Sequence, residues 1–297
     1  MKKYLLIIAA AAAAVAIVSC GKDNGKKIEP DSAEEAAQHQ VAYFPLNSEA
    51  DAIAVGEGIT VAGLGGRGEF STAGFKGGAY NNAAADHDTQ AYLKLNVPKT
   101  FLSSLTSFTV TAWINAPSQR GGIITFDGGT DPNWGAWDLF FDGGDDQGTV
   151  LKGYFFNNGT EWGGFYPTYK GLEVAQNKWI QVTYTYDETT SFSNLYVNGV
   201  LVGPANEETG EITCTNACYA GPKPEEGEQP VLGPLKLSEV SCIYIGAFAS
   251  RETGKSSESW LSYFGGKIDE VHIYNKALSD KQIMNVYKAE VLDSDIE

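Results

Sequence analysis

The 297-residue chain is poor in cations, histidine, cysteine and methionine. It has 21 Lys and Arg against 37 Asp and Glu, which gives a formal net charge of −16 at pH 7. Because this charge repels phosphate backbones and anionic lipid, we do not expect a nucleic-acid-binding protein. Three histidines and four cysteines also supply little material for a zinc site or a disulfide framework.

Glycine and aromatic residues are abundant instead. The chain has 34 Gly, 15 Tyr, 14 Phe and 6 Trp, whereas charged residues make up 20%. Helical bundles favour Ala, Glu, Lys and Leu, while aromatic residues are enriched in β-strands. The composition therefore favours β structure, and the length suffices for one large β domain or two average domains.

The first twenty residues have the pattern of an export signal. Lys2 and Lys3 precede fourteen apolar residues, Leu5 to Val18, and this run is too short for a membrane-spanning helix. The sequence up to Cys20 resembles the lipobox of bacterial lipoproteins, which are cleaved before the cysteine. The resemblance implies that residues 1–19 are removed and that Cys20 is the lipid attachment site. An ordinary signal peptide with an incidental cysteine is the alternative.

The residues after Cys20 indicate the cellular location of the protein and a flexible tether. Gly21 rather than Asp follows Cys20, and by resemblance to Gram-negative sorting rules this implies an outer-membrane lipoprotein facing the periplasm or the cell exterior. Removal of residues 1–19 leaves 19 cations against 37 anions, a net charge of −18. Residues 20–40 are polar and acidic, with too little apolar surface to offset the entropy of ordering. We expect a lipidated cysteine followed by a flexible tether.

After residue 40 the chain consists of short alternating runs separated by Gly, Asn, Asp and Pro. Every second residue is apolar in 108–114 and 180–186, which is the period of a half-buried strand. Asn198-Gly199 separates two further apolar runs and is the typical sequence of a two-residue hairpin. One antiparallel β-sandwich over residues 41–292 is the simplest interpretation.

A short helix is expected at the end of this domain. Ser279 and Gln282 have the spacing of a capping box. Ile283, Val286 and Tyr287 then share one helical face, which can dock onto the sandwich.

Residues 203–239 interrupt the strand pattern with five of the 11 prolines and many Glu. A segment of this length is long for a hairpin connection, so we interpret it as an insertion. It is either a binding loop for a protein partner or an elaboration at the edge of the sandwich with no binding role. Cys214, Cys218 and Cys242 are the disulfide candidates, since an exported protein can form disulfides. One thiol is left over within a monomer.

Residues 264–279, FGGKIDEVHIYNKALS, resemble the closing strand and helix cap of LamG-like jelly-roll domains of the concanavalin A-like lectin and glucanase superfamily. Four more segments resemble earlier parts of the same domain: 43–47, 108–114, 178–180 and 195–199. The resemblance covers roughly residues 41–290 and implies an all-β jelly roll with a short C-terminal α-helix. Family members bind carbohydrate, mediate adhesion or have no known ligand, so the fold alone leaves the function open.

Hydrolysis requires a suitable pair of carboxyl groups, about 5 Å apart in a retaining glycosidase. The laminarinase-type enzymes of the superfamily carry them as Glu-x-Asp-x-x-Glu, and the literal match in this chain is Glu29–Glu34 in the tether. Asp269 and Glu270 are adjacent, so in a regular strand they point to opposite faces. We therefore expect no catalytic residues. A glycosidase with a non-standard pair, such as Asp138 with Glu161, is the second alternative.

Residues 134–169 contain eleven aromatic residues in 36 positions. Sugar rings stack their C–H faces on aromatic planes, while sugar hydroxyls bind carboxylates and amides. We predict a non-catalytic carbohydrate-binding site at Trp134, Trp137, Asp138, Trp162 and Tyr166, with a glycan or glycosylated surface as partner. The first alternative is a structural or adhesive domain that binds protein, in which these aromatics are ordinary core and edge residues.

The same region has acidic, Gly-rich loops that could supply oxygen ligands to calcium. The family resemblance puts Asp131 near the loop ligands of calcium-dependent members. It also puts Asp269 at the position of an Asp that holds a structural calcium in some superfamily enzymes. Asp127, Asp131 and Asp269 are therefore the candidate ligands, although acidic turns are common without metal. No other cofactor is expected.

Overall fold

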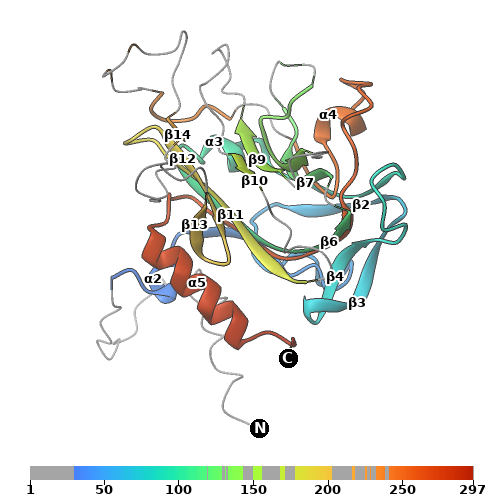
Figure 1. Cartoon of the computed structure of the whole chain (residues 1–297), viewed down its shortest axis with the longest axis horizontal. Helices are drawn as coiled ribbons and strands as arrows, with labels where there is room; N and C mark the ends of the chain where they lie inside the picture. The colour runs from blue at the N-terminus through green and yellow to red at the C-terminus, as the bar shows by residue number, and fades with distance from the viewer. Residues whose placement is uncertain are drawn as a thin grey trace.

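A computed structural model describes residues 30–118, 120–128, 131, 133–142, 150–155, 168–170, 178–202, 216–217, 225, 228, 232–237 and 241–296. Within this part of the chain, two antiparallel β-sheets pack face to face, and a helix follows the last strand (Figure 1). The predicted all-β sandwich with a short C-terminal helix is therefore confirmed.

Sheet A has the strand order β13-β12-β11-β6-β16-β4-β3, with β1 paired to β16 and β14 paired to β12. The bounds of its strands are β1 Gln40–Phe44, β3 Gly68–Lys76, β4 Gly78–Asn82, β6 Phe108–Ser118, β11 Ile180–Asp187, β12 Phe192–Val197, β13 Val200–Val202, β14 Asn216–Ala217 and β16 Gly265–Tyr274.

Sheet B has the strand order β10-β9-β8-β7-β15-β5-β2. The bounds of its strands are β2 Thr60–Gly66, β5 Ala91–Asn96, β7 Gly121–Phe126, β8 Trp137–Asp142, β9 Val150–Phe155, β10 Thr168–Lys170 and β15 Cys242–Ile245. The described helices are α2 Ala33–Ala37, α3 Lys99–Ser103, α4 Ala249–Glu252 and α5 Asp280–Leu292.

The main core lies between the sheets and follows the alternation seen in the sequence. β6 pairs in register with β11, and the apolar face of each strand is buried in the core. These core residues are Phe108, Val110, Ala112, Ile114, Ile180, Val182, Tyr184 and Tyr186. The predicted hairpin also forms, because Asn198 and Gly199 adopt φ values of 51° and 77° between β12 and β13. Positive φ at both central residues is the conformation that a type I′ turn requires.

α5 covers the outer face of sheet A. The predicted capping box is present, with the Ser279 hydroxyl accepting from the Gln282 amide. Ile283 and Val286 are buried in a second apolar cluster on this face. Tyr287 stacks on Trp113 of β6 at a ring separation of 5.6 Å. Figure 1 shows α5, with α2 beside it, on the opposite side of the sandwich from α4.

The folded domain begins earlier than the predicted boundary at residue 41. Residues 33–37 form α2, which Ser32 caps through a bond from the Glu35 amide. Ala36 is buried in the α5 cluster, and Gln40 already belongs to β1. The polar composition of this segment predicts a tether, but its few apolar atoms are buried by α5.

Several predictions fall outside the described residues. These are the signal peptide and Cys20, most of the 203–239 insertion, and the side chains of Trp162, Tyr166, Cys214 and Cys218. Among the helices that the structure describes, none is long and apolar enough to cross a membrane.

Candidate functional site

β8 positions the candidate site because its side chains alternate between two environments. Trp137, Leu139 and Phe141 point into the main core. Asp138 and Phe140 therefore lie on the outer face of sheet B, opposite the side where α5 packs. This outer face carries a group of aromatic rings that pack against one another outside the main core.

We call this group the outer-face aromatic cluster. Its members are Trp134, Phe140, Tyr154, Phe248 and Trp260. The ring centroid of Trp134 lies 4.7 Å from that of Tyr154, 5.3 Å from that of Phe140 and 5.2 Å from that of Trp260. Phe140, Tyr154 and Phe248 are buried, whereas Trp260 is 45% exposed and Trp134 is half-buried. The cluster thus has a packed base and an exposed indole at its surface.

A set of hydrogen bonds holds the Trp134 loop in place. The Asp131 carboxylate accepts from the amides of Asn133 and Trp134 at 2.8 and 3.2 Å. The Ser250 hydroxyl donates to the Asn133 carbonyl at 2.7 Å, and the Ser256 hydroxyl donates to the Asn133 side-chain oxygen at 2.6 Å. The loop before β8 is therefore fixed to the segment that carries Trp260. Such preorganisation reduces the entropy lost when a ligand is bound.

The structure contradicts a direct ligand role for Trp137 and Asp138. Trp137 is fully buried and packs against Phe108, Phe126 and Tyr184, so its ring has no free face. Asp138 is also fully buried and accepts from the Gly135 amide at 2.8 Å. The neighbouring Gly135 predicts an exposed loop, but Trp137 and Asp138 already lie within β8, where pairing and packing cover both side chains.

Burial has a clear effect on the Asp138 carboxyl. It raises the pKa of Asp138 to about 8, and the nearby charges of Asp131 and Asp127 act in the same direction. The bond from Gly135 acts against this rise. At neutral pH the group is therefore largely protonated, and it is closed off from any substrate.

Trp260 is the site residue that the sequence analysis missed. It lies 91 positions beyond the aromatic-rich stretch of 134–169, in the polar sequence Gly254-Lys-Ser-Ser-Glu-Ser-Trp260. A large apolar residue at the end of a run of polar residues was the available signal. Its proximity to Trp134 depends on the pairing of β15 with β7, which brings α4 and the following segment over sheet B.

The three candidate calcium ligands do not come together. The Asp127 carboxylate contacts Lys255 Nζ at 3.3 Å, and the Asp131 carboxylate caps its own loop. Asp269 lies in sheet A, where it accepts from the amides of Phe75, Lys76 and Glu270 at 2.8 to 3.0 Å. No group of three or more His, Cys, Asp or Glu in the described part of the chain is arranged to hold a metal ion. The three carboxylates therefore do not form one site, and calcium binding stays a prediction.

Cys242 is a free, buried thiol whose sulfur lies 3.8 Å from Asn96 Oδ1. This agrees with the alternative that leaves Cys242 as the unpaired thiol. A bond between Cys214 and Cys218 stays a prediction, because both lie outside the described residues.

The adjacent carboxyls of Asp269 and Glu270 form the other acidic feature of the sandwich. A register shift in β16 between Asp269 and His272, with Glu270 at a φ of 45°, breaks the regular alternation. The Glu270 carboxylate accepts from the Tyr43 hydroxyl at 2.9 Å, and Tyr43 stacks on His272. Both carboxyls therefore lie on the outer side of sheet A, contrary to the prediction of opposite faces.

These two carboxyls are closed to substrates. Asp269 is fully buried and Glu270 is 3% exposed. Burial raises the pKa of Asp269 to about 8 and that of Glu270 to about 7. A glycosidase pair must reach the bond that it cleaves, so the geometry of this pair favours a structural role.

α5 adds a third, largely buried carboxyl to this face. Glu290 Oε2 accepts at 2.6 Å from both Trp113 Nε1 and Gln181 Nε2. Burial raises the pKa of Glu290 to about 8 and lowers that of His272 to about 3. His272 is thus neutral, with Nδ1 donating to Gln40 Oε1 at 2.9 Å. Its Nε2 lies 3.2 Å from Glu290 Oε1, a close contact without hydrogen-bond geometry.

Comparison with solved structures gives distant likenesses. The binding domain of botulinum neurotoxin DC, solved with rat synaptotagmin II, is 13% identical with a TM-score of 0.50; the match covers 85% of this chain and 52% of that one. Domain 4 of the extracellular arabinanase AbnA from Geobacillus stearothermophilus, solved with arabinotriose, is 18% identical with a TM-score of 0.46; the match covers 84% and 98%. This chain thus spans about half the length of the toxin binding domain.

Sequence comparison places the family more directly. No curated protein matches the chain. A family model described as the concanavalin A-like lectin/glucanases superfamily matches residues 87–242. This range is more than half of the chain and runs from the loop before β5 to the first residue of β15. With its two antiparallel sheets, the chain belongs to the concanavalin A-like lectin/glucanase superfamily.

Proposed function

We propose that the chain binds carbohydrate without catalysis, through the exposed edge of the outer-face aromatic cluster. The observation that carries the proposal is the exposed Trp260 indole, packed against Trp134 on a buried aromatic base. An exposed Trp ring leaves a large apolar surface in contact with water, and a ligand that covers this surface is bound favourably. A sugar ring has an apolar C–H face that can stack on the indole.

Polar residues lie in both segments that carry the paired indoles. Asp131 and Asn133 lie in the Trp134 loop, and Lys255 and Glu258 lie in the segment leading to Trp260. Carboxylates and amides of this kind can bind the hydroxyls that a stacked sugar presents, and they orient the ligand in most small-molecule sites. The superfamily includes lectins, which agrees with this reading of the surface.

The absence of catalysis is part of the proposal. Asp138, Asp269 and Glu270 are the carboxyls in the described sandwich that sequence reasoning considered for hydrolysis, and each is at most 3% exposed. A buried carboxyl cannot protonate a leaving group or attack a sugar.

The proposal also includes the location. We infer an outer-membrane lipoprotein anchored through Cys20, which would present the domain to the periplasm or to the cell exterior. The support is the lipobox-like sequence and the short apolar run before it.

The test is a glycan array followed by calorimetry with the sugars that bind. Trp260→Ala should weaken binding about fivefold or more, since stacking on an indole contributes about 1 kcal/mol or more. Trp179→Ala is the matched control, because Trp179 is half-buried but packs on Phe75, away from the cluster. Equal affinities for the parent and Trp260→Ala would refute this site. A protein partner without any bound sugar would favour the adhesive alternative.

A further inference from the structure

A cleft on the sandwich shares no residue with the outer-face aromatic cluster. This cleft has a volume of about 820 Å³ and is formed by three segments: the start of β1, the loop 54–58, and the turn into α3 with α3 itself. Ligand sites in proteins typically measure about 300–1,000 Å³. The cleft is therefore large enough for an organic ligand of several rings.

The walls of the cleft are held by the fold. Tyr43 of β1 and Val55 form an isolated β-bridge, with the Tyr43 amide donating to the Val55 carbonyl at 2.9 Å. On the other wall, Leu102 of α3 and Leu105 just after it are buried in the main core. Both walls are thus anchored before a ligand arrives, which lowers the entropic cost of binding.

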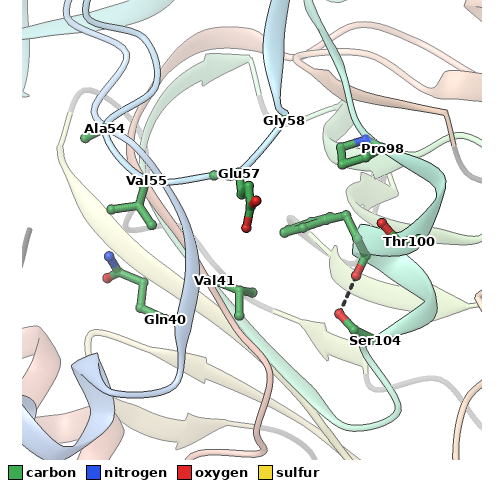
Figure 2. A pocket seen from close by; sticks show the side chains of 11 residues that line it. Gln40, Val41, Ala54, Val55, Glu57, Gly58, Pro98, Thr100 and Ser104 are labelled. Atoms are coloured by element: carbon green, nitrogen blue, oxygen red, sulfur yellow. Dashed lines mark hydrogen bonds between the residues drawn. The ribbon is translucent and has the colours of Figure 1, made fainter. Parts of the chain in front are cut away.

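Glu57 is the one charged side chain of the cleft lining and points into it (Figure 2). The flanking Gly56 and Gly58 have φ values of 149° and 74°, and a Cβ on Gly58 would lie 3.3 Å from Pro98. Glycine on both sides therefore lets the loop turn tightly and present the Glu57 side chain. No hydrogen bond or ion pair holds the Glu57 carboxylate within the described residues.

The other polar groups are an amide and two hydroxyls, from Gln40, Thr100 and Ser104. Gln40 Oε1 already accepts the bond from His272 Nδ1, so the amide NH2 is the part of Gln40 left for a ligand. The Ser104 hydroxyl donates to the Phe101 carbonyl and is left as an acceptor. The cleft thus offers a donor in Gln40, acceptors in Glu57 and Ser104, and a Thr100 hydroxyl that can do both. Val41, Val55 and Phe101 supply apolar surface beside these groups.

This combination selects a class of ligand. An anionic ligand finds no cation in the lining and meets the field of a chain with a net charge of −16. A cation would pair with Glu57 but leave the Gln40 donor without an acceptor. A sugar hydroxyl both donates and accepts, and the C–H faces of the ring fit the apolar wall.

We propose that the cleft between β1, the loop 54–58 and α3 is a second carbohydrate site, which takes a neutral oligosaccharide. The ligand class rests on the proposed function, whereas the place and the residues are independent of it. Two sites on one domain would raise the avidity for a polymeric glycan without any new contact.

The experiment uses the full chain and a panel of neutral trisaccharides of the cello, malto, xylo and arabino series, titrated by calorimetry. Four variants are compared with the parent: Trp260→Ala for the cluster, Glu57→Ala and Thr100→Trp for the cleft, and Glu49→Ala as a control at another exposed loop glutamate. We expect Trp260→Ala to retain one binding event. When added to Trp260→Ala, Glu57→Ala should weaken the affinity of this remaining event at least tenfold, and Thr100→Trp should abolish the event by filling the cleft. Glu49→Ala should leave its affinity unchanged.

The outcomes separate the two proposals. If Trp260→Ala binds none of the trisaccharides that the parent binds, the cleft proposal fails and the proposed function stands. If Glu57→Ala and Thr100→Trp remove all binding while Trp260→Ala has no effect, the aromatic cluster fails and the cleft stands. Spermidine is the cationic probe: Glu57-dependent binding of spermidine without any Glu57-dependent sugar binding overturns the cleft proposal.

Discussion

At the scale of single residues, the buried carboxyls show how strongly tertiary contacts change side-chain chemistry. Glu290 is near the end of α5 and reads as an ordinary surface charge in the sequence. In the fold it accepts from Trp113 and Gln181 and contacts His272, with only 13% of its side chain exposed. Because desolvation penalises the charged form, its pKa rises from 4.5 to about 8.

This pKa gives the protein a pH-dependent stability. For a carboxyl whose pKa is raised by folding, the stabilising contribution is complete below pH 4.5 and is lost as the pH rises toward 8. Glu290→Gln removes this loss, since glutamine keeps an oxygen for Trp113 and Gln181. We expect the variant to be more stable than the parent by about 1–3 kcal/mol at pH 8.5 and nearly equal to it at pH 4.5.

Urea unfolding at the two pH values measures this difference. Glu49→Gln, at an exposed position, is the matched control and should change neither value. Asp138, Asp269 and Glu270 titrate in the same direction in the parent and in the variant, so the comparison isolates Glu290. An equal stability difference at both pH values would contradict the assignment.

At the scale of elements, the strands of the core and the Asn198-Gly199 hairpin were predictable because their signals are local. α2 was not, since an isolated five-residue helix cannot offset the cost of its own nucleation. It forms because α5 buries Ala36 and because Asp31 accepts from the Ser279 hydroxyl at 3.0 Å. The irregular pairing at Glu270 also left no sequence signal, because the segment reads as a regular strand.

Substitutions at the N-cap of α5 test this coupling between α5 and the N-terminal segment. The Ser279 hydroxyl accepts from the Gln282 amide and donates to Asp31, so one atom joins α5 to the N-terminal segment. Ser279→Ala should cost about 1 kcal/mol, or about 2–4 °C in Tm. Ser279→Thr keeps the hydroxyl and should retain most of the stability. Thermal unfolding followed by circular dichroism measures both, and equal losses in the two variants would contradict a role for the hydroxyl.

At the scale of the whole molecule, both candidate sites lie on the sandwich, whereas the proposed lipid anchor lies at Cys20, before the described residues. The anchor therefore has a test of its own. If Cys20 is acylated, a chain expressed in a Gram-negative host should incorporate labelled palmitate and fractionate with the outer membrane. Cys20→Ser should abolish the label and release the chain from the membrane. Cys242→Ser is the matched control, because Cys242 lies in β15 and is buried. Labelling that survives Cys20→Ser would disprove the anchor.

The sequence by itself determined the fold class, the alternating faces of β6 and β11, the β12–β13 hairpin and the cap of α5. Each depends on residues that are close in the chain or on a two-residue period. Only the tertiary structure decided which aromatics are exposed: Trp137 is in the core, while Trp134 meets Trp260 from 126 positions away. Likewise, Glu57 lies beside α3 because the pairing of β2 with β5 brings the residues before β2 next to those after β5. Alternation predicts the face of the sheet on which a side chain lies. Whether that face is buried depends on segments far away in the sequence.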